Sequence, residues 1–202
     1  MHKLSIDNFR SLDERDIVDN PYVSRDEYRV LFDIIESNDI KNILEIGVSY
    51  GRTSRNILKN FSKIERYIGV DVDEFHSFEK IPSQVTERPS CPGEFALSLN
   101  DSRFEIFLFP NGIEDLKGFD GFFDLVIIDG DHSYSGVKKD TSFAKKLIRK
   151  NGFIFWHDYD NLAGVNKFID EYNSSDSVVF VRGCRCCYDQ IFGTVIRQSK
   201  KR

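Results

Sequence analysis

Two short stretches of the sequence place acids and histidines directly after apolar runs. In "IIDGDHSY" these residues are Asp129 and His132, and in "FWHDYDN" they are His157 and Asp158. If the two runs are neighbouring parallel strands, about 4.8 Å apart, Asp129 and Asp158 approach each other closely. Two adjacent carboxylates repel unless a proton or a cation lies between them, and Mg²⁺ prefers such oxygen ligands. The spacing therefore indicates a candidate divalent-metal site at Asp129 and Asp158.

A glycine-containing turn in "LEIGVSYGRTSRNIL" separates a strand-like run from a helix-like run. Ligands of open α/β sheets bind outside the carboxyl ends of the strands, and Gly47 and Gly51 let the backbone come close to a ligand there. Ser49 replaces the middle glycine of the dinucleotide fingerprint G-x-G-x-x-G, which counts against a pyrophosphate site. Asp71 ends the next strand-like run, "YIGVD", where a carboxylate can accept hydrogen bonds from ribose hydroxyls. Asp71 indicates a ribose but does not choose between an adenosyl cofactor and NAD.

The spacing Glu45-x-Gly47-x-x-x-Gly51 resembles the first motif of class I S-adenosylmethionine-dependent methyltransferases. The segments "GVD", "IDGDHSY" and "HDY" follow in order, and the resemblance runs from about residue 25 to 197. These segments are similar to the small metal-dependent O-methyltransferases that act on macrolide sugars and on catechols. The resemblance implies that the following residues bind S-adenosylmethionine: Glu45, Gly47, Ser49, Gly51, Asp71, Asn111 and Asp129.

The same resemblance implies roles for the acids and histidines. In the sugar-acting branch a D-G-x-H element supplies a metal-binding acid and a catalytic base, which correspond to Asp129 and His132. The acid pair at the next strand end corresponds to His157 and Asp158, so the implied metal ligands are Asp129, His157 and Asp158. The chain departs from the family here, because His157 stands where an acid is expected and Tyr159 where the catechol branch has Asn or Asp. His132, with an ordinary pKa near 6.5, is suited to accept a proton at neutral pH.

The order of apolar runs predicts one domain over residues 1–202, of the α/β class. We expect a Rossmann-like three-layer sandwich with a mostly parallel seven-stranded sheet and a C-terminal antiparallel hairpin. The expected parallel strands are "KNILEIGV", "RYIGVDV", "RFEIFLF", "FFDLVIID" and "GFIFWHDY", and the expected hairpin strands are "SVVFVRG" and "QIFGTVIRQ".

Capping signals and helical spacing predict the helices. Ser24 and Glu27 have the capping-box spacing, so a helix is expected to begin after Ser24. Others are expected over 52–61, from about 133 to 150 with Asn151-Gly152 as its end, and from about 162 to 172. Residues 1–22 are expected to be an arm, and the proline-containing stretch 74–100 a lid-like insertion.

Composition limits the classes of partner. The net charge of −5 argues against nucleic acid as a partner. No apolar run is long enough to span a bilayer and no signal-peptide pattern opens the sequence, so we expect no membrane partner and a cytoplasmic location. The four cysteines should then be reduced. "GCRCC" lacks paired C-x-x-C spacing, which favours buried thiols on a late strand over a zinc site.

The sequence thus favours an S-adenosylmethionine-dependent methyltransferase that acts on a hydroxyl of a small molecule, such as a sugar or a natural product. His132 would be the base and Mg²⁺ a candidate cofactor. The alternatives are an NAD-dependent or nucleotide-sugar oxidoreductase, a non-catalytic S-adenosylmethionine-binding domain, and a methyltransferase acting on nitrogen. The sequence leaves a homo-oligomer open.

Overall fold

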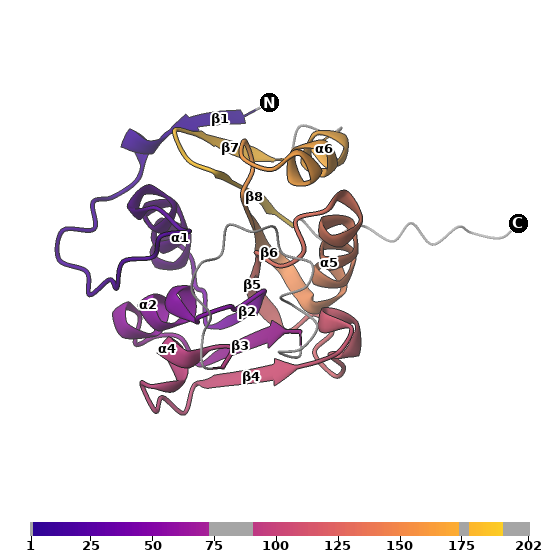
Figure 1. Ribbon diagram of the computed structural model, residues 1–202. Coiled ribbons are helices and arrows are strands. Elements are labelled where there is room, and N and C mark those ends of the chain that lie inside the picture. The colour runs from indigo at the N-terminus through magenta and orange to yellow at the C-terminus, as the bar shows by residue number, and fades with distance from the viewer. Residues whose placement is uncertain (1, 73–90, 174–177, 192–202) are drawn as a thin grey trace, which may run out of the picture.

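The computed structural model describes residues 2–72, 91–173 and 178–191, and in this part of the chain one sheet runs through the centre of the molecule (Figure 1). The sheet has eight strands in the order β1-β7-β8-β6-β5-β2-β3-β4. The strands are β1 (His2–Ser5), β2 (Asn42–Ile46), β3 (Arg66–Asp71), β4 (Phe104–Leu108), β5 (Phe123–Ile128), β6 (Ile148–His157), β7 (Val179–Arg182) and β8 (Cys186–Gln190).

The central strands are parallel, and β8 is antiparallel to both β6 and β7. Every residue of β5 is buried, as expected for a strand whose two faces are both covered by helices. The predicted α/β class, the mostly parallel sheet and the antiparallel C-terminal strands are therefore confirmed.

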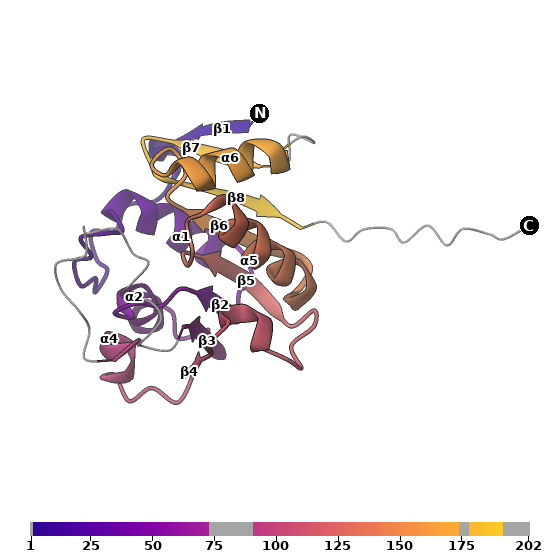
Figure 2. The ribbon, with the colours of Figure 1, turned by 45° about the vertical axis from the view of Figure 1, so that its right-hand side comes forward.

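Helices cover both faces of the sheet. Figures 1 and 2 show α1, α2 and α4 on one face and α5 and α6 on the other. The helices and 3₁₀ turns are η1 (Ile6–Asn8), α1 (Arg25–Ser37), α2 (Arg52–Asn60), α4 (Glu94–Leu97), η2 (Gly112–Asp115), α5 (Tyr134–Leu147) and α6 (Ala163–Tyr172). Alternate residues of each strand enter two separate cores: Ile127 packs with Leu31 of α1, whereas Ile128 packs with Val137 of α5. Within the described ranges, no helix has the length and hydropathy that crossing a bilayer requires.

The capping box at the start of α1 is confirmed. The Glu27 amide donates to Ser24 Oγ at 3.3 Å, and the Ser24 amide donates to Glu27 Oε2 at 2.6 Å. This reciprocal pair satisfies two of the backbone donors that a helix start leaves free. It also fixes where the Glu27 side chain lies.

The N-terminal segment differs from the expected arm, because His2–Ser5 form an eighth strand. β1 pairs in parallel with β7, with Leu4 opposite Val181. Four residues are too few to show a strand period, and their partner strand lies at the far end of the chain. The sequence pattern therefore carries no signal for β1.

Two predicted boundaries are also wrong. Helix α5 ends at Leu147 instead of Lys150, since Ile148 already pairs with Phe123 in the sheet. Asn151, with φ +64°, lies in β6 where its register with β5 shifts, so the Asn-Gly signal marks a strand irregularity and not a helix end. The last described strand, β8 (Cys186–Gln190), begins four residues before the expected start at Gln190.

Two predicted segments lie partly outside the described residues. Residues 73–90 of the expected insertion lie outside the described residues, and Glu94–Leu97 form α4. Residues 192–198 of the expected last strand also lie outside them.

All four cysteines carry free thiols. Cys184, Cys186 and Cys187 are buried, and the last two lie on β8, as predicted for "GCRCC".

Candidate active site

The carboxyl ends of β2, β5 and β6 lie side by side at one edge of the sheet. Ile128 is the register partner of both Ile46 in β2 and Trp156 in β6. Asp129 and His157, each one residue further along, are therefore neighbours. The Asp129 amide donates to the Ile46 carbonyl at 2.8 Å, which fixes the first residue beyond β5.

The glycine turn after β2 packs directly against the end of β5. Gly47 has φ +86°, and a Cβ at this position would lie 2.3 Å from the Asp129 carbonyl oxygen. Gly51 has φ +73° and is the N-cap of α2; its Cβ would lie 2.8 Å from Gly93 Cα. Only glycine fits either place, so both residues predicted from the motif are required by the backbone geometry.

Asp71 closes this turn through its carboxylate. Its Oδ2 accepts hydrogen bonds from the amides of Val48, at 2.9 Å, and Ser49, at 2.8 Å, and its Oδ1 accepts one from Val72 at 2.7 Å. Burial raises the pKa of Asp71, and these amide bonds act in the opposite direction. A carboxylate has about four lone-pair sites, so about one remains, on Oδ1, for a ligand hydroxyl.

Two other residues expected to bind the cofactor have different surroundings. Glu45 is 2% exposed, and its Oε2 accepts a hydrogen bond from the Tyr67 hydroxyl at 2.9 Å. Burial raises the pKa of Glu45 well above its usual range, and the Tyr67 hydrogen bond acts in the opposite direction. Asn111 is exposed at the start of η2, where its amide donates to Asp115 at 3.5 Å. Their roles toward a cofactor stay predictions.

The acids and histidines from the two strand ends form one cluster. His132 Nε2 lies 3.2 Å from Asp129 Oδ1 and 3.1 Å from Asp158 Oδ2. His157 Nδ1 lies 3.0 Å from Asp129 Oδ1 and 3.2 Å from Asp158 Oδ2. The four potential ligand atoms all lie within 4.8 Å of one another. The structure thus brings together all four residues that the sequence singled out for chemistry.

Asp158 joins this cluster from a left-handed backbone conformation. The residue has φ +60°, a backbone conformation that residues other than glycine adopt less readily. Its Oδ1 accepts a hydrogen bond from Asn161 Nδ2 at 2.7 Å, while Oδ2 faces the two histidines. Backbone strain at a residue that contributes to a polar cluster is typical of functional sites.

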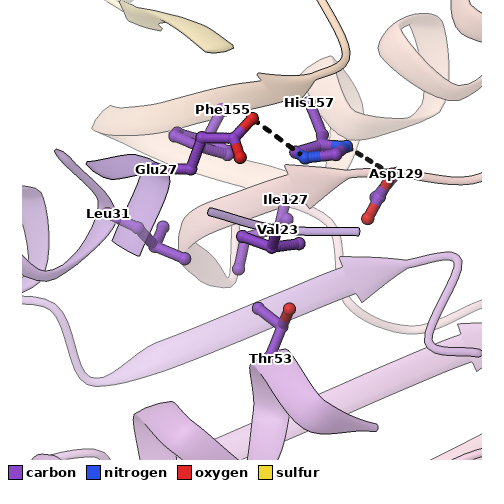
Figure 3. Close-up of a pocket in the computed structure, with 8 residues that line it drawn as sticks. All are labelled: Val23, Glu27, Leu31, Thr53, Ile127, Asp129, Phe155 and His157. Carbon is purple, nitrogen blue, oxygen red and sulfur yellow. Dashed lines mark ion pairs between the residues drawn. The ribbon is translucent and has the colours of Figure 1, made fainter. Parts of the chain in front are cut away.

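Glu27 is a member of the site that the sequence did not reveal. It is fully buried, and its Oε1 lies 3.1 Å from His157 Nε2 (Figure 3). Its Oε2 lies 3.4 Å from an Arg185 guanidinium nitrogen, and the other terminal nitrogen of Arg185 is 4.0 Å from Asp158 Oδ1. The capping-box pattern explains a glutamate at this position without any further role. The one remaining signal is a glutamate directly beside Tyr28 on the apolar face of a helix.

Equal numbers of acidic and basic groups meet at this site. Three carboxylates face three basic groups: Glu27, Asp129 and Asp158 against His132, His157 and Arg185. Burial disfavours the charged form of His132, but the hydrogen bonds and charges of Asp129 and Asp158 outweigh burial and raise its pKa to about 9. Burial likewise opposes charge on His157, and Asp129, Asp158 and Glu27 together raise its pKa well above the usual range.

A cavity of about 10 Å³ lies on the α1 side of the cluster, lined among others by Glu27, Thr53, Asp129 and His157. Figure 3 shows these side chains converging on it from α1, α2 and the ends of β5 and β6. This volume is at the lower limit for holding one water molecule. The α1 side of the site is therefore closely packed.

Comparisons with known proteins agree with this geometry. Residues 44–159 match the family model described as "Methyltransferase domain". An uncharacterized protein of Acanthamoeba polyphaga mimivirus is 24% identical over 179 residues, covering 82% of this chain and 76% of that protein.

Two solved structures show the same fold at 16% identity. The cofactor-bound protein Rv0187 from MTB has a TM-score of 0.61 over 88% of this chain and 84% of that chain. The O-methyltransferase TomG from Streptomyces achromogenes, involved in tomaymycin synthesis and solved in complex with SAM, has a TM-score of 0.57 over 85% and 82%. The matched family segment begins in β2, includes the glycine turn that follows β2, and ends just beyond Asp158. It therefore contains both the glycine turn and the acid–histidine cluster. The chain belongs to the methyltransferase-domain family and has the fold of a class I methyltransferase.

Proposed function

We propose that this protein transfers a methyl group from S-adenosylmethionine to a hydroxyl group of a small molecule. The observation that carries the proposal is the contact between the glycine turn and the acid–histidine cluster at one edge of the sheet. The glycine turn packs on the Asp129 carbonyl, and the Asp129 side chain belongs to the acid–histidine cluster. The similarity to the O-methyltransferase TomG, which binds SAM, supports both the cofactor and the hydroxyl acceptor.

In this proposal the turn side of the site holds the cofactor. Gly47, Ser49 and Gly51 let it approach the backbone, and Asp71 Oδ1 accepts a hydrogen bond from its ribose. When bound, S-adenosylmethionine supplies a methyl group that its sulfonium already activates. The chain then has to align the acceptor and remove its proton.

The cluster side of the site receives the acceptor. His132 is the member of the cluster that takes the hydroxyl proton, at Nε2, with its side chain 35% exposed. With Asp129 and Asp158 beside it, His132 has a pKa of about 9 and keeps its proton at neutral pH. Positive charge placed beside Asp129 and Asp158 would compensate these acids and lower that pKa.

A divalent cation fits this place. Asp129, His157 and Asp158 are the residues that would hold it, as the sequence indicated. Among the described residues, neither nitrogen of the buried His157 has a partner in hydrogen-bond geometry, although both lie close to carboxylates. When bound, a divalent cation would orient the acceptor hydroxyl and lower its pKa.

The proposal is tested by separating binding from turnover. Calorimetric titration with S-adenosylhomocysteine should show one site in the wild type and in His132→Ala. A panel of hydroxyl acceptors, assayed with and without divalent cations, should then show methyl transfer by the wild type and its loss in the variant. Binding without methyl transfer on the whole panel would indicate a non-catalytic binding domain instead. Absence of binding, together with binding of NAD, would favour the oxidoreductase alternative.

A further inference from the structure

We propose that the cation site formed by Asp129, His157 and Asp158 selects a first-row transition ion over Mg²⁺, and that Glu27 is the positioning residue that imposes this choice. The inference rests on the cation of the proposed function, but not on methyl transfer. It concerns the atom that His157 offers, the carboxylate behind it and the spacing of the ligands.

His157 Nδ1 lies between two carboxylates. This nitrogen lies 3.0 Å from Asp129 Oδ1 and 3.2 Å from Asp158 Oδ2. Ligands about 2.0–2.1 Å from one tetrahedral ion are about 3.3 Å apart, so these separations need little change on binding. The ring nitrogen is thus already at metal-ligand spacing from both acids, and the potential ligand atoms lie within 4.8 Å of one another.

A buried carboxylate lies behind the ring. Glu27 Oε1 lies 3.1 Å from His157 Nε2, and the two residues are 0% and 4% exposed. In metal-ligating histidines a carboxylate against one ring nitrogen holds the proton there and leaves the lone pair of the other nitrogen for the metal. With a metal bound, Glu27 would in this way direct Nδ1 at Asp129 and Asp158.

Glu27 is itself held in place from two directions. The Ser24 amide donates to its Oε2 at 2.6 Å, and an Arg185 nitrogen lies 3.4 Å from the same oxygen. Oε1 is thereby left to His157. The helix start and the hairpin between β7 and β8 both hold one side chain, and that side chain orients the imidazole.

The contacts of His157 leave room for a cation. Neither His157 nitrogen has a partner in hydrogen-bond geometry among the described residues, although carboxylate oxygens lie 3.0–3.2 Å away. Buried polar groups normally have such a partner, and a cation between Nδ1 and the two acids would supply it. The competing occupant is a proton, which would make His157 a permanent imidazolium and leave no metal site.

The donor type decides which ion is selected. Oxygen ligands suit Mg²⁺, whereas an imidazole nitrogen suits Zn²⁺, Fe²⁺ and Ni²⁺. Affinity for a nitrogen-containing site generally rises from Mn²⁺ through Co²⁺ to Ni²⁺. His157, which stands where the resemblance led us to expect an acid, therefore changes the expected ion as well as the ligand set.

The wild-type test needs no cofactor and no acceptor. The metal-stripped full chain is titrated in a calorimeter with Co²⁺, Mn²⁺ and Mg²⁺ separately. We expect Co²⁺ to bind at least about tenfold more tightly than Mg²⁺, with Mn²⁺ between them. Equal affinity for Mg²⁺, or no binding of any of the three ions, would overturn the inference. Binding of S-adenosylhomocysteine is measured separately, so either proposal can fail while the other stands.

Spectroscopy tests the nitrogen ligand directly. Pulsed EPR of the Mn²⁺-loaded protein should show coupling to an imidazole nitrogen. In His157→Asn, whose amide oxygen can reach the former Nδ1 position, Mn²⁺ should still bind, a nitrogen coupling should be lost and the preference for Co²⁺ over Mg²⁺ should shrink. An unchanged spectrum and unchanged preference in this variant would contradict the assignment of His157.

Glu27→Gln tests the positioning role with its fold preserved. The glutamine carbonyl can still accept from the Ser24 amide, but its charge toward His157 is gone. Loss of such an outer carboxylate typically lowers metal affinity by about 10- to 100-fold, and we expect that loss for Co²⁺. Ser24→Ala is the matched control, because it removes the Oγ half of the capping box and leaves the carboxylate. Equal Co²⁺ affinity in wild type and Glu27→Gln would remove Glu27 from the site.

Discussion

The two halves of the candidate site are built in different ways. The turn after β2 is shaped by backbone, with glycines at Gly47 and Gly51 and amide hydrogen bonds to Asp71. The cluster at the ends of β5 and β6 is made of side chains, and residues from α1 and the β7–β8 hairpin complete it. The backbone half depends on local sequence, and the side-chain half depends on the whole fold. Substitutions should therefore affect the two halves separately, except where they touch.

The largest expected effect separates the halves by their chemistry. His132→Ala should lower kcat by about 10²- to 10⁴-fold, since a general base typically contributes that much. Affinity for S-adenosylhomocysteine, measured by calorimetry, should stay at the wild-type value because the glycine turn is untouched. A parallel loss of both quantities would show that the halves are not separable.

The converse change acts on the backbone half. Asp71→Ala should weaken S-adenosylhomocysteine binding by about 10- to 150-fold, the equivalent of about 1.5–3 kcal/mol for hydrogen bonds to a charged acceptor. Part of that loss would come from Val48 and Ser49, whose amides lose their acceptor. Metal affinity in the same variant should match the wild type. An unchanged cofactor affinity would remove the ribose assignment.

The pH dependence of thermal stability tests the side-chain half of the site. The pKa of His132 is raised from 6.5 to about 9, so its favourable interaction with Asp129 and Asp158 is fully present below about pH 6.5. That contribution is lost as the pH rises through 9. Thermal midpoints of the metal-free protein should fall across this window, and the fall should be smaller in His132→Gln. Parallel curves for both proteins would mean that His132 titrates elsewhere.

The smallest effect is expected at the rim of the cluster. Arg185 is 39% exposed and lies at 3.4 Å from Glu27 and 4.0 Å from Asp158. Ion pairs with such an exposed partner contribute about 0–1 kcal/mol, so Arg185→Ala should lower the free energy of unfolding in urea by no more than that. A loss several times larger would mean that Arg185 is part of the buried charge balance and not of its rim.

The contrast also explains what the sequence could reveal. Asp71, Asp129 and Asp158 are visible because a polar residue ending an apolar run marks a strand end, and parallel strands end at one edge. Gly47 and Gly51 are visible because their spacing follows from one local turn. These signals require only short-range order, and the structure places every one of these residues at the expected edge.

Glu27 was not visible for the opposite reason. Its local pattern is fully explained by the capping box with Ser24, while its second partner, His157, lies at the end of β6, far away in the sequence. β1 was missed on the same grounds, since four residues gain their partner only in β7. The boundary between α5 and β6 was predicted too late in the chain, because Ile148 suits a helix face and a strand equally well. Long-range pairing decided all three.

The pairing of β1 with β7 has a consequence for biosynthesis. β1 precedes its partner in the chain, so it can join the sheet only after Val179–Arg182 have emerged from the ribosome. Until then His2–Ser5 have no place in the sheet, and a chaperone or a protease can reach them. This outer strand is thus translated long before it can be added to the sheet.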